Sequence, residues 1–303
     1  MKKTFYSNGK LLITGEYVVL DEAIALGLPT KFGQNLFIED KKLNQIINWK
    51  SLDNDLSVWF EDTISFQAIK SKECFENPIK NTLVEILHEA HKLNSDLLLN
   101  SDGFEITTQL TFPRNWGLGT SSTLINNIAQ WFKIDAFALL RKSFGGSGYD
   151  IACAQNNFPI LFQLVGSEQI IKQVSFKPTF HDNIYFVYLN KKQSSKIAIE
   201  NYRKNQKILS PIIIEINLLT DKILKATNLI DLEIYLKKHE NIISQILETK
   251  TIQETLFPDF CGVIKSLGAW GGDFVMVICE ENPTNYFKNL GYPTLLKFEE
   301  IIL

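Results

Sequence analysis

The chain has 303 residues, which is enough for one large domain or for two domains of ordinary size, each with a hydrophobic core. Apolar residues make up 45% of the sequence and charged residues 21%, which is typical of a globular protein and excludes wholesale disorder. The formal net charge of −3 offers no basic patch for a nucleic acid, so we expect no nucleic-acid partner.

The sequence also argues against a membrane protein. No apolar run approaches the roughly 20 residues that span a bilayer, and the stretch from Met1 to Thr14 lacks the pattern of a signal peptide. The four cysteines lie far apart and form no Cys-x-x-Cys pair, as expected for reduced thiols rather than for disulfides or a zinc site. We therefore expect a soluble, cytoplasmic protein with no membrane partner, and the sequence leaves its oligomeric state open.

Strand-like segments dominate the first half of the chain. Short apolar runs at 11–13 and 17–20 lie on either side of a turn at Gly15 and Glu16. The periodicity of 78–93 predicts an amphipathic helix, because its aliphatic residues recur on one side. Further strands are predicted at 35–38, 56–60 and 104–110.

The second half is richer in helices. Three segments are polar on one side and aliphatic on the other, which predicts helices at 196–209, 212–226 and 232–247. Apolar runs predict strands at 160–164, 184–189, 274–279 and 294–298, and a short helix is predicted at 284–289. This order predicts an α+β fold with two domains, residues 1–180 and 181–303.

A glycine-rich loop follows the predicted strand at 104–110. It reads Pro-Arg-Asn-Trp-Gly-Leu-Gly-Thr-Ser-Ser and directly precedes an apolar-periodic segment. Glycines let the main chain approach a ligand closely, and hydroxyls at a helix start lie beside unpaired amides that attract anions. Helix capping alone is the simpler alternative. We predict a nucleotide-phosphate site formed by Pro113, Gly117, Leu118, Gly119, Thr120, Ser121 and Ser122.

Two further glycine clusters each end in an acidic residue. They are Gly145-Gly146-Ser147-Gly148-Tyr149-Asp150 and Gly268-Ala269-Trp270-Gly271-Gly272-Asp273. Tight turns use the same residues, so either cluster alone is weak evidence for a site. Three such clusters in one chain favour a binding site over plain structural turns.

Together with the start of the chain, these clusters resemble the motifs of the GHMP kinases. Ser7 to Val19 resembles the first motif of that family, Pro113 to Ser122 the second, and Gly268 to Asp273 the third. Gly146 to Ala152 resembles the segment that carries the catalytic aspartate. The segments follow the order of the family, and the resemblance covers essentially the whole chain. The sequence departs from the usual motifs at Asn8, Thr120, Ser122 and Trp270.

The resemblance implies an N-terminal, ATP-binding domain of the ribosomal-protein-like α+β type and a ferredoxin-like C-terminal domain. It implies ATP and Mg²⁺ as cofactors, Ser121 as a metal ligand, and Asp150 and Lys10 as catalytic residues. Phosphoryl transfer needs positioning and charge neutralisation, which a lysine beside an aspartate helps to provide. A helix-capping Asp150 and a solvated Lys10 are the alternatives.

The resemblance further implies a small, anionic substrate. The residues implied for its binding are Glu16, Tyr17, Ser147, Gly148, Lys191, Ser194, Ser195, Gly271 and Gly272. Lys191 belongs to the basic segment 190–196, for which a solvated turn before a helix is an equally good interpretation.

We expect an ATP-dependent kinase that acts on phosphomevalonate or mevalonate. The first motif and the aspartate segment are most similar to the phosphomevalonate kinase branch. The same residues suit an alcohol or a phosphate acceptor, so the motifs do not settle the substrate. A kinase of a sugar or an amino-acid alcohol, a diphosphomevalonate decarboxylase, and a non-catalytic nucleotide-binding homologue are the alternatives.

Overall fold

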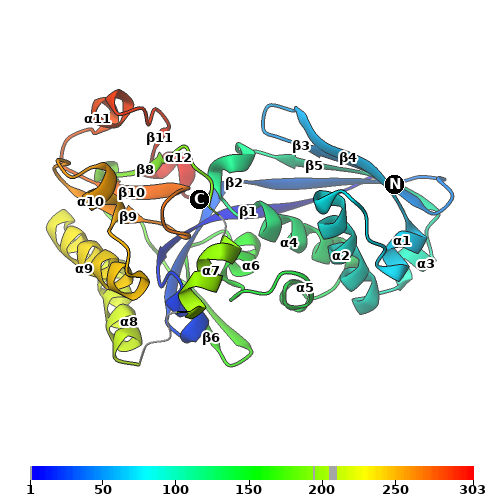
Figure 1. Ribbon diagram of the computed structural model, residues 1–303, viewed down its shortest axis with the longest axis horizontal. Coiled ribbons are helices and arrows are strands. Elements are labelled where there is room, and N and C mark those ends of the chain that lie inside the picture. The colour runs from blue at the N-terminus through cyan, green and yellow to red at the C-terminus, as the bar shows by residue number, and fades with distance from the viewer. Residues whose placement is uncertain (1, 194, 205–209) are drawn as a thin grey trace. The chain divides into compact units, whose positions relative to one another are not determined.

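The computed structural model describes residues 2–193, 195–204 and 210–303. By its contacts the chain groups into two compact units (Figure 1). Unit 1 comprises Met1–Gly9, Phe32–Arg114 and Leu118–Gln155, and unit 2 comprises Lys10–Lys31, Asn115–Gly117 and Asn156–Leu303. This grouping places residues 156–180 with the C-terminal part of the chain, and a single domain boundary near residue 180 stays a prediction.

Unit 1 combines strands with a set of helices. Strand β3 (Ile46–Leu52) pairs with β4 (Val58–Ser65) in antiparallel and with β5 (Gly103–Leu110) in parallel orientation. The later part of β2 (Ala25–Asp40) pairs with β5, and β1 (Lys2–Thr14) pairs with β2. The helices are α1 (Phe66–Ser71), α2 (Pro78–Leu93), α3 (Asp96–Leu99), α4 (Thr120–Phe132), α5 (Ala136–Ser143) and α6 (Tyr149–Gln155).

Local sequence explains the start of α2, the helix predicted at 78–93. Asn77 accepts hydrogen bonds from the backbone N–H groups of Ile79 and Lys80, and Pro78 occupies a position where its missing N–H costs nothing. The aliphatic side of α2 packs into a core that includes Trp49 and Phe66. The helix prediction is confirmed.

A buried polar network fixes α4 against the strands of unit 1. Thr123 Oγ1 donates to Gln34 Oε1 at 2.8 Å, and Asn127 Nδ2 donates to the Gln34 carbonyl at 2.9 Å. Ser7 Oγ donates to Asn127 Oδ1 and accepts from Asn126 Nδ2. These side chains are almost completely buried, so the bonds hold the first turns of α4 in one position.

Unit 2 contains a four-stranded antiparallel sheet with the order β11-β8-β10-β9. Every residue of β8 and β10 is buried, in agreement with the apolar runs from which these strands were predicted. The first part of β2 pairs with β6, which pairs with β7. The strands are β6 (Ile160–Val165), β7 (Glu168–Gln173), β8 (Ile184–Tyr188), β9 (Val263–Ser266), β10 (Phe274–Ile278) and β11 (Leu295–Lys297).

Over the described residues, the helices of unit 2 agree with the periodicity of the sequence, and residues 205–209 of the helix predicted at 196–209 lie outside them. These helices are α7 (Ser195–Lys204), α8 (Ser210–Leu224), α9 (Leu229–Leu247), α10 (Ile252–Leu256), α11 (Thr284–Asn289) and α12 (Phe298–Ile301). Two sheets with helices confirm the α+β class, whereas the ribosomal-protein-like and ferredoxin-like descriptions stay predictions. Within the described residues, no helix is both long enough and apolar enough to cross a membrane.

One predicted strand is wrong. Residues 17–20 do not form a strand, because Val18–Asp21 is a 3-10 helix, η1. Tyr17 has a positive φ of 63°, and the Val19 N–H donates to the Gly15 carbonyl across a tight turn. Apolar runs of this length do not distinguish a strand from a buried helical turn.

Candidate functional site

The start of α4 is open to an anion. Gly119 precedes the helix with a φ of 94°, and in the described structure no side chain caps its first turn. The hydroxyls of Thr120, Ser121 and Ser122 make no hydrogen bond among the described residues, and Ser121 is exposed. Unpaired amides and free hydroxyls at a helix N-terminus form a phosphate-binding arrangement. Leu118 is fully buried, so its side chain anchors the loop in the interior.

The donor groups at this helix start also suit Mg²⁺. Hydroxyl oxygens are hard ligands, and Mg²⁺ usually keeps several waters and binds phosphate oxygens, so it needs few protein ligands. In the described part of the chain, no group of three His, Cys, Asp or Glu residues is arranged to hold a metal ion. The Ser121 hydroxyl is exposed, and its role as a metal ligand stays a prediction.

The segment that carries Asp150 also belongs to unit 1. Helix α6 begins at Tyr149, so Asp150 lies in its first turn, and α6 packs against α4. Gly148 has a φ of 94°, and a Cβ atom there would lie 3.1 Å from the Phe137 ring. Ser147 is buried, and its Oγ accepts a long hydrogen bond of 3.5 Å from the Tyr149 N–H. The positive φ and the tight approach to Phe137 both favour glycine at position 148.

In unit 2, Lys10 lines a small pocket together with parts of two glycine motifs. The Lys10 ammonium donates a hydrogen bond of 3.3 Å to the Gly117 carbonyl. The lining residues are Lys10, Leu11, Leu12, Trp116, Gly117, Leu267, Gly268, Asp273 and Phe274. The structure thus brings parts of the first, second and third motif segments together around one ammonium group.

Asp273 joins this pocket to the basic segment after β8. Its carboxylate accepts a hydrogen bond of 3.1 Å from the Gln193 N–H, and its own N–H donates to the Lys191 carbonyl at 2.6 Å. Gly271 and Gly272 lie so close to Gln193 and Lys191 that a Cβ atom on either glycine would clash. The Lys191 segment and the third glycine motif therefore form one surface.

Burial raises the pKa of the Asp273 carboxyl, whereas the Gln193 N–H and the charges of Lys10 and Lys192 lower it. Asp273 also has a positive φ of 52°, which costs free energy for a residue with a Cβ atom. A strained, half-buried acid that holds two loops together is a feature we missed in the sequence. The available signal was its position at the end of the third glycine cluster.

Trp270 packs against Tyr17 within unit 2. Its backbone N–H donates to the Tyr17 hydroxyl at 3.0 Å, and its ring contacts the apolar cluster around Tyr17. Burial raises the pKa of Tyr17 to about 12, so this phenol stays neutral. The large side chain at position 270 thus helps to hold the turn that carries Glu16 and Tyr17.

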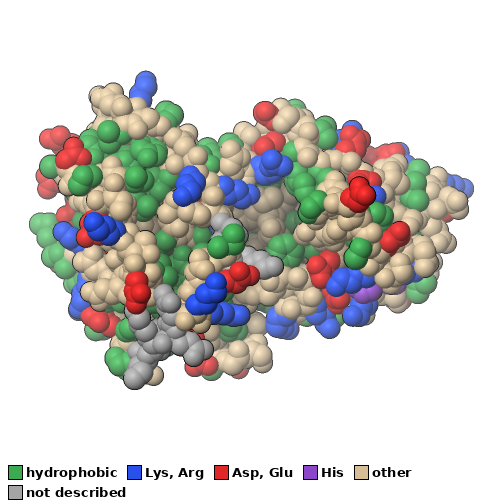
Figure 2. Space-filling model, viewed as in Figure 1, with side chains coloured by type: hydrophobic (Ala, Val, Ile, Leu, Met, Phe, Trp, Pro, Cys, Tyr) green, Lys and Arg blue, Asp and Glu red, His purple; other side chains and the backbone are tan. Residues whose placement is uncertain are grey.

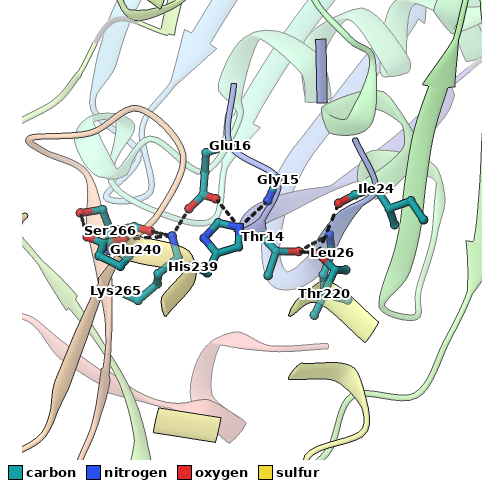
Figure 3. Close-up of polar contacts among 10 residues, drawn as sticks. All are labelled: Thr14, Gly15, Glu16, Ile24, Leu26, Thr220, His239, Glu240, Lys265 and Ser266. Atoms are coloured by element: carbon teal, nitrogen blue, oxygen red, sulfur yellow. Dashed lines mark hydrogen bonds and ion pairs between the residues drawn. The ribbon is translucent and has the colours of Figure 1, made fainter. Parts of the chain in front are cut away.

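Glu16 lies in the interior of unit 2. Its side chain is only 1% exposed and forms an ion pair with Lys265 of β9 (Figure 3). His239 and Glu240 of α9 complete this buried group. The sequence does not mark Lys265, His239 and Glu240 as site residues, since nothing local distinguishes them from surface residues.

The remaining predicted residues lie as follows. Ser194 is outside the described residues, and Ser195 begins α7 without a described side chain. Lys191 is exposed, and Pro113 is half-buried. On the face drawn in Figure 2, positively and negatively charged side chains are interspersed, in keeping with the small net charge.

Gly117→Ala is expected to disturb the pocket. A Cβ atom at this position would overlap the Asp273 carboxyl group, and the φ of 70° is unfavourable for alanine. We expect a loss of about 2–4 kcal/mol in the free energy of unfolding, which combines left-handed strain with overpacking. Denaturant titration of the wild type and the variant measures this difference in the free energy of unfolding.

Gly145→Ala is the matched control for this substitution. Gly145 also has a φ of 70°, but nothing lies within 4 Å of its added Cβ atom. It should therefore show the backbone strain alone, about 1 kcal/mol. Equal losses in the two variants would contradict the predicted overlap with Asp273.

No protein-family model matches the chain, and no curated protein matches it in sequence. Solved structures do match over nearly the full length. The mevalonate kinase of Methanococcus jannaschii is 16% identical, with a TM-score of 0.70 over 98% of this chain and 97% of that one. The Streptococcus pneumoniae phosphomevalonate kinase, in complex with phosphomevalonate and AMPPNP, is 15% identical, with a TM-score of 0.72 over 98% and 100%.

The structure of galactokinase from Lactococcus lactis, complexed with galactose, also matches this chain over nearly its full length. It is 14% identical, with a TM-score of 0.70 over 98% of this chain and 92% of that one. All three proteins are GHMP kinases. The chain therefore has the GHMP kinase fold, and the resemblance seen in its motifs is confirmed at the level of the fold.

Proposed function

We propose that the protein is an ATP- and Mg²⁺-dependent kinase that transfers the γ-phosphoryl group to phosphomevalonate or mevalonate. One observation carries this proposal: within a GHMP kinase fold, α4 begins with an uncapped turn and three free hydroxyls. A helix N-terminus of this kind binds phosphate through its amides and its dipole.

In our proposal, the backbone amides from Gly117 to Ser121 bind the β- and γ-phosphates of ATP, and Pro113 and Ser122 flank them. The polar network of Thr123 and Asn127 supports this role, since it keeps the helix start in place before the ligand arrives. Mg²⁺, held in part by the Ser121 hydroxyl, would neutralise phosphate charge.

The transfer step forms a bond between the acceptor oxygen and the γ-phosphorus and breaks the bond to the ADP oxygen. With an alcohol acceptor, we propose that Asp150 takes the hydroxyl proton. With a phosphate acceptor, which is already ionised near neutral pH, no proton needs to move. Lys10 is proposed to stabilise negative charge on the phosphoryl group during the transfer.

We assign the acceptor to the surface that Asp273 organises in unit 2. Lys191 is exposed and could contact an anionic group, and Gly272 brings the main chain close to the Lys191 carbonyl. Tyr17 is mostly buried, so its proposed contribution is to shape this surface. Ser147 and Gly148 stay candidates for substrate contact next to Asp150.

A kinase of a sugar or an amino-acid alcohol is the second candidate, favoured by the similarity to galactokinase. A non-catalytic nucleotide-binding protein is less well supported, because Lys10, Ser121 and Asp150 all keep the chemical groups that transfer requires. The differences among these candidates lie on the acceptor side.

A coupled assay of ADP release tests the proposal. Mevalonate, phosphomevalonate, galactose and homoserine are offered separately with ATP and Mg²⁺. We expect turnover with phosphomevalonate or mevalonate. Turnover only with galactose or homoserine would move the protein to the second candidate, and ATP binding without turnover would favour the non-catalytic one.

A further inference from the structure

Unit 2 contains a cluster of ionisable side chains that are withdrawn from water (Figure 3). Lys265 and His239 are completely buried, Glu16 is 1% exposed, and Glu240 is 3% exposed. These four residues, which we name the buried charge cluster, come from the first motif, β9 and α9. Charged groups are rarely buried unless they are paired, so their protonation states must be compatible.

The contacts define the state of His239. Its Nε2 atom accepts a hydrogen bond of 3.0 Å from the Gly15 N–H, so Nε2 carries no proton. Burial and the charge of Lys265 both lower the pKa of this imidazole well below its usual value. His239 is therefore neutral, and the cluster has one ammonium group for two carboxyl groups.

The two carboxyl groups have different surroundings. Glu240 Oε1 accepts from the Ser266 N–H at 3.1 Å and from the Ser266 hydroxyl at 2.7 Å, and Oε2 lies 3.2 Å from Lys265 Nζ. Burial raises the pKa of Glu240, whereas Lys265 and these hydrogen bonds lower it and favour the carboxylate. Together, the two carboxyl groups outweigh the effect of burial and raise the pKa of Lys265.

Glu16 pairs with Lys265 through Oε1, but its Oε2 has no hydrogen-bond partner among the described residues. This Oε2 lies 3.6 Å from His239 Nε2, whose lone pair is directed at the Gly15 N–H. If Glu16 were ionised, its Oε2 would lie in the interior beside the lone pair of His239 Nε2, and neither atom would have a proton to share. A proton on Oε2 removes this conflict and leaves Lys265 with one full carboxylate partner.

We propose that Glu16 is a neutral carboxylic acid in mildly acidic solution, and that the buried charge cluster is a positioning device for the acceptor side of the site. Through it, the Gly15–Tyr17 turn and β9 are both fastened to α9. The strand β9 leads directly into the Gly268 loop, and Trp270 of that loop donates to Tyr17. The positioning role replaces the predicted contact of Glu16 with substrate and rests on the proposed function.

Ionisation of Glu16 would place a second anion beside one ammonium group and loosen this attachment. Burial, together with the charge of Glu240, raises the pKa of Glu16 to about 7, although Lys265 opposes the shift. Outside the buried charge cluster, Tyr17 is the described titratable group that interacts with Glu16, and its phenol stays neutral. The structure thus predicts a change in the acceptor side as the pH rises above about 7.

The first test compares the unfolding of the wild-type protein with that of Glu16→Gln at several pH values, without substrate. A group whose pKa is raised by folding stabilises the folded state below its unfolded pKa and loses this effect as the pH approaches its folded pKa. Relative to Glu16→Gln, the folding equilibrium constant of the wild type should fall by about tenfold per pH unit between roughly 5 and 7. Above pH 7 the difference should be constant.

Two further variants complete this test. Glu215→Gln removes an exposed partner of Lys238 on the neighbouring helix and is the control for the loss of one surface carboxyl group. Glu240→Gln removes the proposed carboxylate and should destabilise the protein more than Glu16→Gln at pH 7. A wild-type advantage over Glu16→Gln that grows with pH would show that Glu16 is ionised and would overturn the proposal.

Infrared difference spectra give a direct readout. We expect a protonated-carboxyl C=O band at pH 6 that is missing in Glu16→Gln and fades in the wild type at pH 9. Its absence from the wild type at pH 6 would also overturn the proposal.

The positioning role is tested by the pH dependence of KM. In the wild type, we expect the acceptor KM to rise above pH 7 while the nucleotide KM stays constant, and Glu16→Gln should lack this rise. Equal pH profiles in both proteins would remove the positioning role. If no acceptor supports turnover, the proposed function fails, whereas the unfolding and infrared results still decide the protonation of Glu16.

Discussion

Asp150→Asn is expected to reduce turnover by about 10²- to 10⁴-fold with an alcohol acceptor, the range typical of a lost general base. The amide keeps the shape of the side chain in the first turn of α6 but does not accept a proton. Nucleotide affinity should be unchanged, because α4 provides the proposed phosphate contacts. Steady-state kinetics and calorimetric titration with a non-hydrolysable ATP analogue measure the two quantities.

The size of this loss also distinguishes the acceptors. A phosphate acceptor needs no strong base, so the loss should then be smaller than about 10²-fold. Asp96→Asn is the control, since Asp96 is an exposed acid in the first turn of α3. If turnover and nucleotide affinity fall equally in Asp150→Asn, the residue has a structural role and our assignment is wrong.

Lys10→Met should lower turnover by about 10²- to 10³-fold, the usual effect of removing one group that stabilises developing charge. Lys10 is bound to the Gly117 carbonyl and lies in the same pocket as Asp273, so its ammonium group is held where two motifs meet. Methionine keeps most of the apolar stem and removes the charge. Steady-state kinetics with saturating ATP measures the change.

Lys50→Met is the matched control for this variant. Lys50 forms an ion pair with Glu61 in which both side chains are largely exposed, and such pairs contribute little. Its turnover should equal that of the wild type. A Lys10→Met protein that turns over normally but binds ATP weakly would limit Lys10 to nucleotide binding.

Much of the fold was predictable because it follows from local patterns. The unbroken apolar runs of β8 and β10 match strands that are buried on both faces, and the cap at Asn77 marks the start of α2. The order of the glycine motifs was sufficient to predict the fold. The turn at Tyr17 was misread because its left-handed backbone leaves no signal in a short apolar run.

The parts of the site that were missed depend on contacts between distant residues. Asp273 and Gln193 are 80 positions apart, and Lys265 is 249 positions from Glu16. A lysine within a four-residue strand normally indicates a solvent-exposed face. Only the folded chain shows that Lys265 pairs with two carboxyl groups. The sequence of β9 alone therefore does not identify the buried charge cluster.

The glycines of the site are needed for folding as well as for any binding role. Gly271 and Gly272 are required by the Gln193 side chain and the Lys191 carbonyl, and Gly117 is required by Asp273. Selection for folding alone would therefore preserve them in a descendant that had lost catalysis. Such a pseudoenzyme would keep the glycine motifs and show its loss at Asp150 and Lys10, whose side chains are not needed to accommodate these close approaches.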